Sequence, residues 1–269
     1  MFKKIILLYV FIFVVVVCYG QRFMVISGEN YPKADTVQYY LPDNINDTSL
    51  YPSVILLHGY GGSYRQWSSI CKMQQLSNEF GMILICLDGF KDSFYIDSPL
   101  KSDEKFATFF RESLIPELKK SLPLDTKMMF ISGLSMGGHG ALYLMSQNPG
   151  VFRAAGSMSG VVDLKASSVA KTCLVKHLGS KTSDNKNWEL YSCVGNINRI
   201  KEAGCPIIVN CGAQDFLIEA NRKFARKCAD AGIDIVYMES PGKHERSYWQ
   251  SMLPEQLRFF RKFINKTLY

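Results

Sequence analysis

Short apolar runs alternate with longer amphipathic stretches along most of the chain. The short runs have the length and composition of buried strands, and the longer stretches have the apolar periodicity of helices. Strands are expected at Val54–Leu57, Met82–Leu87, Met128–Ile131, Ala154–Met158, Pro206–Cys211 and Ile233–Met238. Helices are expected at Trp67–Phe80, about Asp103–Ser121, Met136–Gln147, Phe216–Ala231 and Tyr248–Ile264. This alternation predicts an α/β protein with a mostly parallel central sheet and helices on both faces.

Two regions depart from that alternation. The extended stretches Phe23–Ser27 and Thr36–Leu41 follow one another without a helix, so they predict antiparallel strands at one edge of the sheet. The polar interval Val161–Ile200 predicts a small insertion at the carboxyl edge, where loops of open α/β folds carry binding residues. Within it, Trp188 is a candidate to line a substrate pocket, or to anchor the insertion to the body of the protein.

The first twenty residues have the pattern of a secretory signal peptide. Lys3 and Lys4 precede the apolar run Ile5–Cys18, and a small residue, Gly20, ends the segment. We expect cleavage after Gly20, which leaves residues 21–269 as one domain with no stable membrane span. Lipoprotein anchoring at Cys18 ranks second, because Val17 is larger than the residue that such sites usually have. The predicted location is secreted or periplasmic.

Charge and cysteine content exclude some classes of partner. The formal charge of +7 becomes +5 without the two lysines of the leader, and basic residues are interleaved with acidic ones. This pattern indicates a solvated surface and no nucleic-acid footprint. The cysteine spacing matches no zinc motif, so no metal site is expected. Export permits disulfides, and Cys173 and Cys193, which flank a polar segment, are the candidates for one.

Candidate chemistry begins at Ser135, in the sequence Gly-Leu-Ser-Met-Gly-Gly of residues 133–138. A predicted strand precedes it and a predicted helix follows, which is the order of a nucleophile elbow. The flanking glycines allow the helix to fold back against the strand, while Ser135 takes a strained conformation at the turn. The alternative is a tight strand-to-helix turn in which the serine is only a cap.

A serine hydroxyl needs a general base, and His244 is the candidate. It follows the last predicted strand and precedes the last helix, so its loop can reach Ser135. Asp215 follows the preceding strand and is the candidate acid that orients His244, although it could also cap the next helix. The chain order Ser135, Asp215, His244 is the order of α/β-hydrolases.

The turn His58–Ser63, which is rich in glycine, follows a buried strand and predicts an oxyanion hole. Backbone N–H groups of Tyr60 and Met136 would bracket the developing negative charge. Gly61 in the same turn is a candidate substrate contact. The aromatic residues Phe94 and Tyr95 could stack on a substrate, although packing is their commoner role.

These segments together resemble the putative-esterase family of α/β-hydrolases, which includes S-formylglutathione hydrolases, tributyrin-type esterases, and feruloyl and acetylxylan esterases. The resemblance extends from about Val54 to the carboxyl end. Its motifs are Leu57–Gly62, Gly133–Gly138, Gly212–Phe216 and Gly242–Glu245. It implies an α/β-hydrolase fold, with Ser135, Asp215 and His244 as the catalytic triad and Tyr60 and Met136 as oxyanion donors.

Two departures from the family narrow the function. The glutathione thioesterases usually have a Leu-Thr-Cys-like sequence where this chain has Tyr60-Gly61-Gly62-Ser63, and they work in the cytosol. The related mycolyl transferases tend to have an acid at the position of His58. Both departures favour a hydrolase that acts on other esters.

We therefore expect a secreted or periplasmic serine carboxylesterase that needs no cofactor. Its substrate would be a small ester or an acylated carbohydrate, with short-chain or aromatic acyl groups such as the acetyl and feruloyl groups of plant polysaccharide. An acyltransferase that uses a sugar or lipid alcohol is the alternative enzyme. A catalytically silent carbohydrate-binding protein is the alternative from another class.

Overall fold

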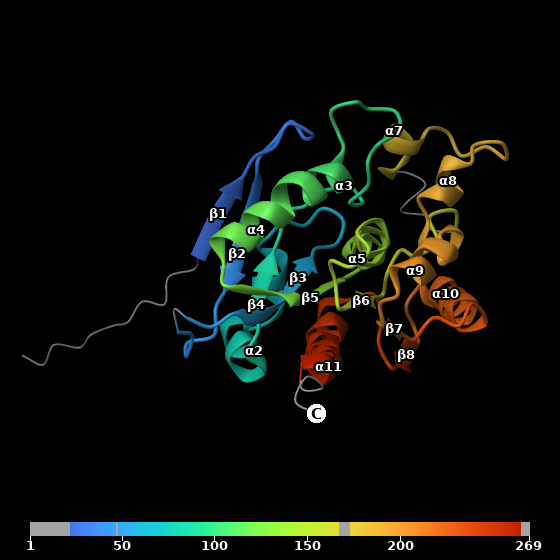
Figure 1. Cartoon of the computed structure of the whole chain (residues 1–269). Helices are drawn as coiled ribbons and strands as arrows, with labels where there is room; N and C mark the ends of the chain where they lie inside the picture. Colours follow the sequence, from blue (N-terminus) through green and yellow to red (C-terminus); the bar gives the residue numbers. More distant parts are fainter. Residues whose placement is uncertain (1–21, 47, 167–172, 265–269) are drawn as a thin grey trace, which may run out of the picture.

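The computed structural model describes residues 22–46, 48–166 and 173–264. The predicted leader, including Cys18, lies outside the described residues. Eight strands form one sheet (Figure 1). They are β1 (Arg22–Ile26), β2 (Asp35–Tyr40), β3 (Tyr51–Leu57), β4 (Ile83–Cys86), β5 (Leu124–Gly133), β6 (Ala154–Met158), β7 (Ile207–Gly212) and β8 (Ile235–Ser240).

The strand order in the sheet is β1-β2-β4-β3-β5-β6-β7-β8. β1 and β2 pair antiparallel at one edge, and β2 is antiparallel to β4. All pairs from β4 to β8 are parallel, so these strands end at the same edge of the sheet. The predicted α/β architecture with a mostly parallel sheet and an antiparallel edge is confirmed.

Helices follow each of the parallel strands. They are α1 (Gln66–Ile70), α2 (Met73–Phe80), α3 (Phe106–Phe109), α4 (Ile115–Ser121), α5 (Met136–Gln147), α7 (Val175–Leu178), α8 (Asn187–Leu190), α9 (Ile197–Ala203), α10 (Ile218–Asp230) and α11 (Arg246–Ile264). Among the residues described, no helix has both the length and the apolar content needed to cross a membrane.

Two predicted helices differ from the structure. The stretch Trp67–Phe80 is broken at Cys71, whose extended backbone separates α1 from α2 and lets Trp67 and Phe80 both reach the same core. The stretch Asp103–Ser121 begins only at Phe106 and contains a π-helical turn, Phe110–Leu114, between α3 and α4. A wider turn of this kind changes which side chains face the sheet.

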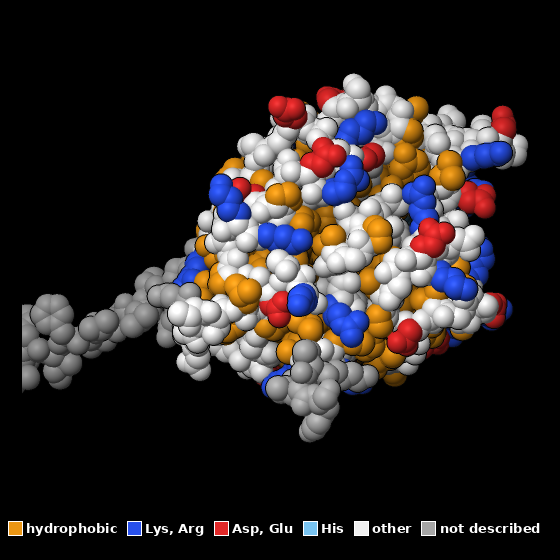
Figure 2. Space-filling model, in the orientation of Figure 1, with side chains coloured by type: hydrophobic (Ala, Val, Ile, Leu, Met, Phe, Trp, Pro, Cys, Tyr) orange, Lys and Arg blue, Asp and Glu red, His pale blue; other side chains and the backbone are white. Residues whose placement is uncertain are grey.

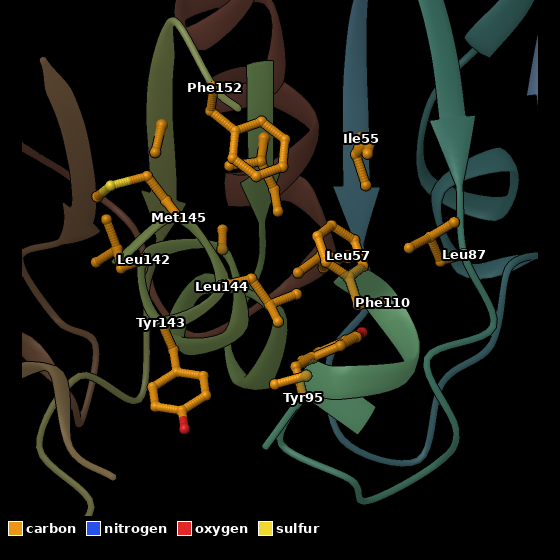
Figure 3. Packing of buried hydrophobic residues seen from close by; sticks show 14 of the residues in the cluster. Ile55, Leu57, Leu87, Tyr95, Phe110, Leu142, Tyr143, Leu144, Met145 and Phe152 are labelled. Carbon is orange, nitrogen blue, oxygen red and sulfur yellow. The ribbon is translucent and has the colours of Figure 1, made fainter. Parts of the chain in front are cut away.

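Two apolar cores cover the two faces of the sheet. One core contains buried residues of α4, α5 and α10, and the other contains those of α1, α2 and α11. Figure 1 shows α4 and α5 on one side of the sheet and α2 and α11 on the other. In Figure 3, Leu57 of β3, Leu144 of α5 and Phe110 point into one shared layer. The helix with Ser135 at its N-terminus is therefore fixed in the middle of the molecule, since eleven of its twelve residues are buried.

The described residues of the interval Val161–Ile200 include several short helices. It follows β6 and includes α7, α8, a 3₁₀ turn at Cys193–Gly195 and the start of α9. Trp188 of α8 is fully buried, and its indole Nε1 donates a hydrogen bond to Gly179 O at 3.1 Å. Of the two roles predicted for Trp188, the structure shows that it anchors the insertion.

The predicted bridge between Cys173 and Cys193 is wrong, because no disulfide links the cysteines that the structure describes. The Cys193 thiol lies in the core beneath α5 and donates to His139 O at 3.6 Å. Cys173 instead interacts with the Tyr60 hydroxyl. Cys173 and Cys193 therefore contact different parts of the protein.

Stacking of Phe260 on Phe130 ties α11 to the central strand β5, with ring centroids 4.9 Å apart. Phe260→Ala leaves a cavity in a fully buried site, so we expect the free energy of unfolding to fall by about 3–5 kcal/mol. Chemical denaturation measures this change. Phe23→Ala removes the same ring from a site that is 44% exposed, and we expect a loss of less than about 0.5 kcal/mol. Equal losses in the two variants would contradict the packing described here.

Candidate active site

Ser135 occupies a strained turn between β5 and α5. Its backbone has φ 54° and ψ −114°, a conformation that L-residues other than glycine avoid. Its carbonyl accepts hydrogen bonds from the N–H groups of His139 and Val161, and its own N–H donates to Met158 O at 2.9 Å. Because the surrounding backbone holds the turn on both sides, the strain persists in the folded state.

The glycines around Ser135 are required by close backbone approach. A Cβ atom on Gly133 would lie 2.3 Å from Gly137 O, and one on Gly137 would lie 2.3 Å from Leu57 O. Neither contact is possible without a backbone shift. The helix therefore starts directly against the strands, as predicted from the glycine spacing.

His244 reaches the serine from the loop between β8 and α11. Its Nε2 lies 2.9 Å from Ser135 Oγ, and its Nδ1 lies 2.9 Å from Asp215 Oδ2. The imidazole packs against Phe216, with ring centroids 4.6 Å apart, and lies perpendicular to the Trp249 ring, with centroids 5.1 Å apart. The structure therefore brings together the three residues that were predicted from distant parts of the sequence.

Asp215 combines the two roles that the sequence left open. Oδ2 faces His244, while Oδ1 accepts the N–H of Leu217 at 2.9 Å just before α10 begins. Burial by itself raises the pKa of Asp215, but the hydrogen bonds from His244 and Leu217 outweigh it and hold the pKa below its usual value. The carboxylate therefore stays ionised beside the imidazole.

The other histidines are buried and engaged elsewhere. Both ring nitrogens of His58 face backbone oxygens, those of Gly59 and Asp88, and burial lowers its pKa. His177 pairs with Glu104, and burial lowers its pKa as well. Across the described part of the chain, no three residues among His, Cys, Asp and Glu gather as metal ligands would.

Tyr60 and Met136 are the residues whose backbone N–H groups were predicted to form an oxyanion hole. Both residues line the cavity beside Ser135, and neither N–H donates to a protein acceptor among the described residues. The turn is held from behind, because Gly59 N donates to Gln66 Oε1 at 2.7 Å. Gln66 was not among the residues predicted from the sequence, although it lies only four positions after Gly62 of the glycine turn.

A cavity of about 230 Å³ opens beside Ser135 and His244. Its walls are mainly apolar and come from Phe94, Leu134, Val161, Phe216 and Trp249, together with the turn residues. Of these, only Phe94 was predicted as a substrate contact. Val161 begins the insertion that was expected to carry binding residues, but it was not singled out there, and Trp249 was assigned only to a helix.

Three predicted substrate contacts, Gly61, Trp188 and Tyr95, do not line this cavity. Gly61 N donates to Lys91 O at 2.7 Å, so Gly61 secures the turn instead. Trp188 lies in the buried anchor described above and does not line the cavity. Tyr95 is fully buried and donates its hydroxyl to His58 O at 3.0 Å. These positions follow from tertiary packing, which the sequence pattern does not contain.

His139, one turn after Ser135, makes stability depend on pH. Its ring nitrogens lie 3.1 Å from Phe94 O and 2.8 Å from Tyr191 O, and burial lowers its pKa to about 4. In the unfolded chain the His139 imidazole becomes protonated below about pH 6.5, whereas in the folded protein it stays neutral down to about pH 4. The free energy of unfolding therefore falls as the pH drops from about 6.5 to 4.

We expect the unfolding free energy of His139→Gln to fall less steeply than that of the wild type between about pH 6.5 and 4. The two slopes should differ by at most about 1.4 kcal/mol per pH unit. Urea denaturation at a series of pH values measures it. Parallel curves for the two proteins would rule out this assignment.

Several solved structures share this architecture. A ferulic acid esterase superposes with a TM-score of 0.77 at 22% identity, over 90% of this chain and 98% of the other. The S-formylglutathione hydrolase of Staphylococcus aureus gives 0.76 at 17% identity, over 90% and 98%. At these identities the likeness shows a common fold.

Sequence comparison gives the family. An acetyl esterase of Caldicellulosiruptor saccharolyticus is 27% identical over 229 residues, which cover 80% of this chain and 85% of the relative. The S-formylglutathione hydrolase of Mus musculus is 23% identical over 252 residues, covering 84% and 88%. The family model described as Putative esterase matches residues 29–260. The chain therefore belongs to the Putative esterase family, and it is an esterase of the α/β-hydrolase superfamily.

Proposed function

We propose that this protein is a serine carboxylesterase that hydrolyses short-chain or aromatic acyl esters, such as acetyl or feruloyl esters of plant polysaccharide. The observation that carries the proposal is the continuous hydrogen-bonded chain from Ser135 Oγ through His244 to Asp215. The small apolar cavity beside it suits an acyl group. A relative named acetyl esterase and a structural neighbour named ferulic acid esterase support the choice of acyl groups.

In the first half-reaction, Ser135 Oγ attacks the carbonyl carbon and its proton passes to His244 Nε2. The negative charge on the former carbonyl oxygen is stabilised by the N–H groups of Tyr60 and Met136. Asp215 holds the imidazole in the required tautomer and stabilises the imidazolium. Collapse of the tetrahedral intermediate breaks the ester bond, and the alcohol leaves with the proton from His244.

In the second half-reaction, His244 removes a proton from water, and the resulting nucleophile attacks the acyl-enzyme. The intermediate collapses to the free acid, and the proton returns to Ser135 Oγ. Phe216 and Trp249 pack against the imidazole, and these contacts limit its motion. No step requires a group beyond these side chains, the backbone N–H groups and water.

Ser135→Ala tests the mechanism. We expect kcat with p-nitrophenyl acetate and methyl ferulate to fall by about a thousandfold or more, because the nucleophile is lost. A fluorophosphonate should label the wild type and not the variant. Ser121→Ala, at the exposed end of α4, is the matched control and should keep full activity and labelling. Equal activity in Ser135→Ala and wild type would reject the proposal.

We also propose that the protein is exported, on the basis of Lys3, Lys4 and the apolar run Ile5–Cys18. After secretion from a host that recognises the signal, intact mass spectrometry should give a chain that begins at Gln21. A mature chain that starts at Cys18 with a lipid attached would establish the lipoprotein alternative. Retention of residues 1–20 would defeat the export proposal.

A further inference from the structure

The loop after β4 contains three bulky residues with left-handed backbone. Phe90, Phe94 and Tyr95 have φ values of 55°, 49° and 62°. Each such residue costs about 1–3 kcal/mol, and strain of this kind concentrates at functional sites. Neither the Ser135 turn nor the relay to Asp215 uses Phe90, so its strain needs a separate explanation.

Buried polar groups hold this loop in place. The carboxylate of Asp35, which is fully buried, accepts the N–H groups of Asp88 and Gly89, each at 2.9 Å. Ser93 Oγ bonds back to Gly89 O, and the Tyr95 hydroxyl donates to His58 O. These hydrogen bonds within the fold therefore hold the loop in its conformation.

The same loop forms walls of two cavities. Phe94 lines the cavity beside Ser135, whereas Phe90, Lys91 and Asp92 line a second cavity of about 480 Å³. The oxyanion turn, whose Gly59 and Tyr60 line the first cavity, is bonded to the wall of the second, since Gly61 N donates to Lys91 O at 2.7 Å. The Tyr60 hydroxyl forms a hydrogen bond with Cys173. This bond raises the pKa of Tyr60, and the nearby Asp92 carboxylate raises the pKa of Tyr60 further.

The second cavity combines aromatic rings with balanced charge. The Tyr31 and Phe90 rings stack with centroids 4.1 Å apart and planes 1° from parallel. Lys176 forms an ion pair with Asp92 across the cavity wall. The charged residues that line it are Lys33, Lys91, Lys176, Asp88, Asp92 and Glu104. Figure 2 shows basic and acidic side chains intermixed above α3, between the β1–β2 connection and α7.

This lining favours one class of ligand. An acyl chain would desolvate charged groups without replacing their hydrogen bonds, which is unfavourable. An anion would meet as many carboxylates as ammonium groups. A neutral sugar presents hydroxyls that both donate and accept, and an apolar ring face that can lie on an aromatic ring. The volume also falls within the usual range for small-ligand pockets.

We propose that the second cavity binds the alcohol half of the substrate, a neutral oligosaccharide, while the acyl group occupies the cavity beside Ser135. This proposal rests on the esterase function proposed above. The ester bond then lies at the oxyanion turn between the two cavities. Selectivity for acylated saccharides over simple esters comes from the second cavity, and the acyl cavity serves both kinds of substrate.

Phe90→Gly and Tyr31→Ala test the proposal with two substrates, monoacetylated xylotriose and p-nitrophenyl acetate. Phe90→Gly removes the ring but accepts left-handed backbone, so it relieves strain and keeps the loop folded. We expect the ratio of kcat/KM for acetylated xylotriose to kcat/KM for p-nitrophenyl acetate to fall about tenfold in each variant. Phe23→Ala, an exposed aromatic on β1, should leave this ratio unchanged. An unchanged ratio in both cavity variants would overturn the proposal.

A binding experiment separates this proposal from the esterase function. Unacetylated xylotriose is titrated into Ser135→Ala by calorimetry, where no turnover is needed. Saturable binding, with an affinity about tenfold weaker in the double variant that also has Phe90→Gly, supports saccharide binding in the second cavity. Absence of saturable binding overturns it, even if the wild type is an active esterase. If the wild type shows no esterase activity in any assay but xylotriose still binds, the catalytic proposal alone is rejected.

Discussion

The left-handed backbone of Ser135 is the constraint around which the active site is arranged. The turn exists because two neighbouring positions lack a Cβ atom, so that α5 starts against the ends of β3 and β5. This contact places Ser135 and Met136 on the wall of the cavity. Strain at Ser135 is sustained by the buried packing of α5, since an isolated chain would relax it.

Parallel strand topology then brings the partners to the serine. Asp215 follows β7 and His244 follows β8, two strands that end at the same edge as β5. The helix α11, which begins just after His244, is fixed by polar as well as apolar contacts. Gln256 reaches into the sheet, where Nε2 donates to Asn210 Oδ1 at 2.7 Å and Oε1 accepts from Ser132. A buried network that is fully bonded in this way resists changes in helix register.

A second strained segment lies beside the first. The loop with Phe90 and Phe94 contributes to the catalytic cavity and to the larger polar one, and Asp35 holds its start by accepting two backbone N–H groups. Both strained segments are therefore attached to buried elements that form part of the core. This arrangement keeps the cavities preorganised, so that little ordering remains to be done when a substrate binds.

The sequence by itself determined the order of strands and helices, the elbow at Ser135 and the choice of Asp215 and His244, because glycine spacing and the ends of apolar runs are local signals. It did not determine that Trp188 is an anchor, that Cys193 and Cys173 have separate neighbours, or that Trp249 and Gln66 surround the site. Those positions depend on how distant segments pack, and on a π-helical turn and a helix break that periodicity does not reveal. Only the tertiary structure decided them, because side-chain direction relative to a distant element is fixed by the packed core and not by neighbouring residues.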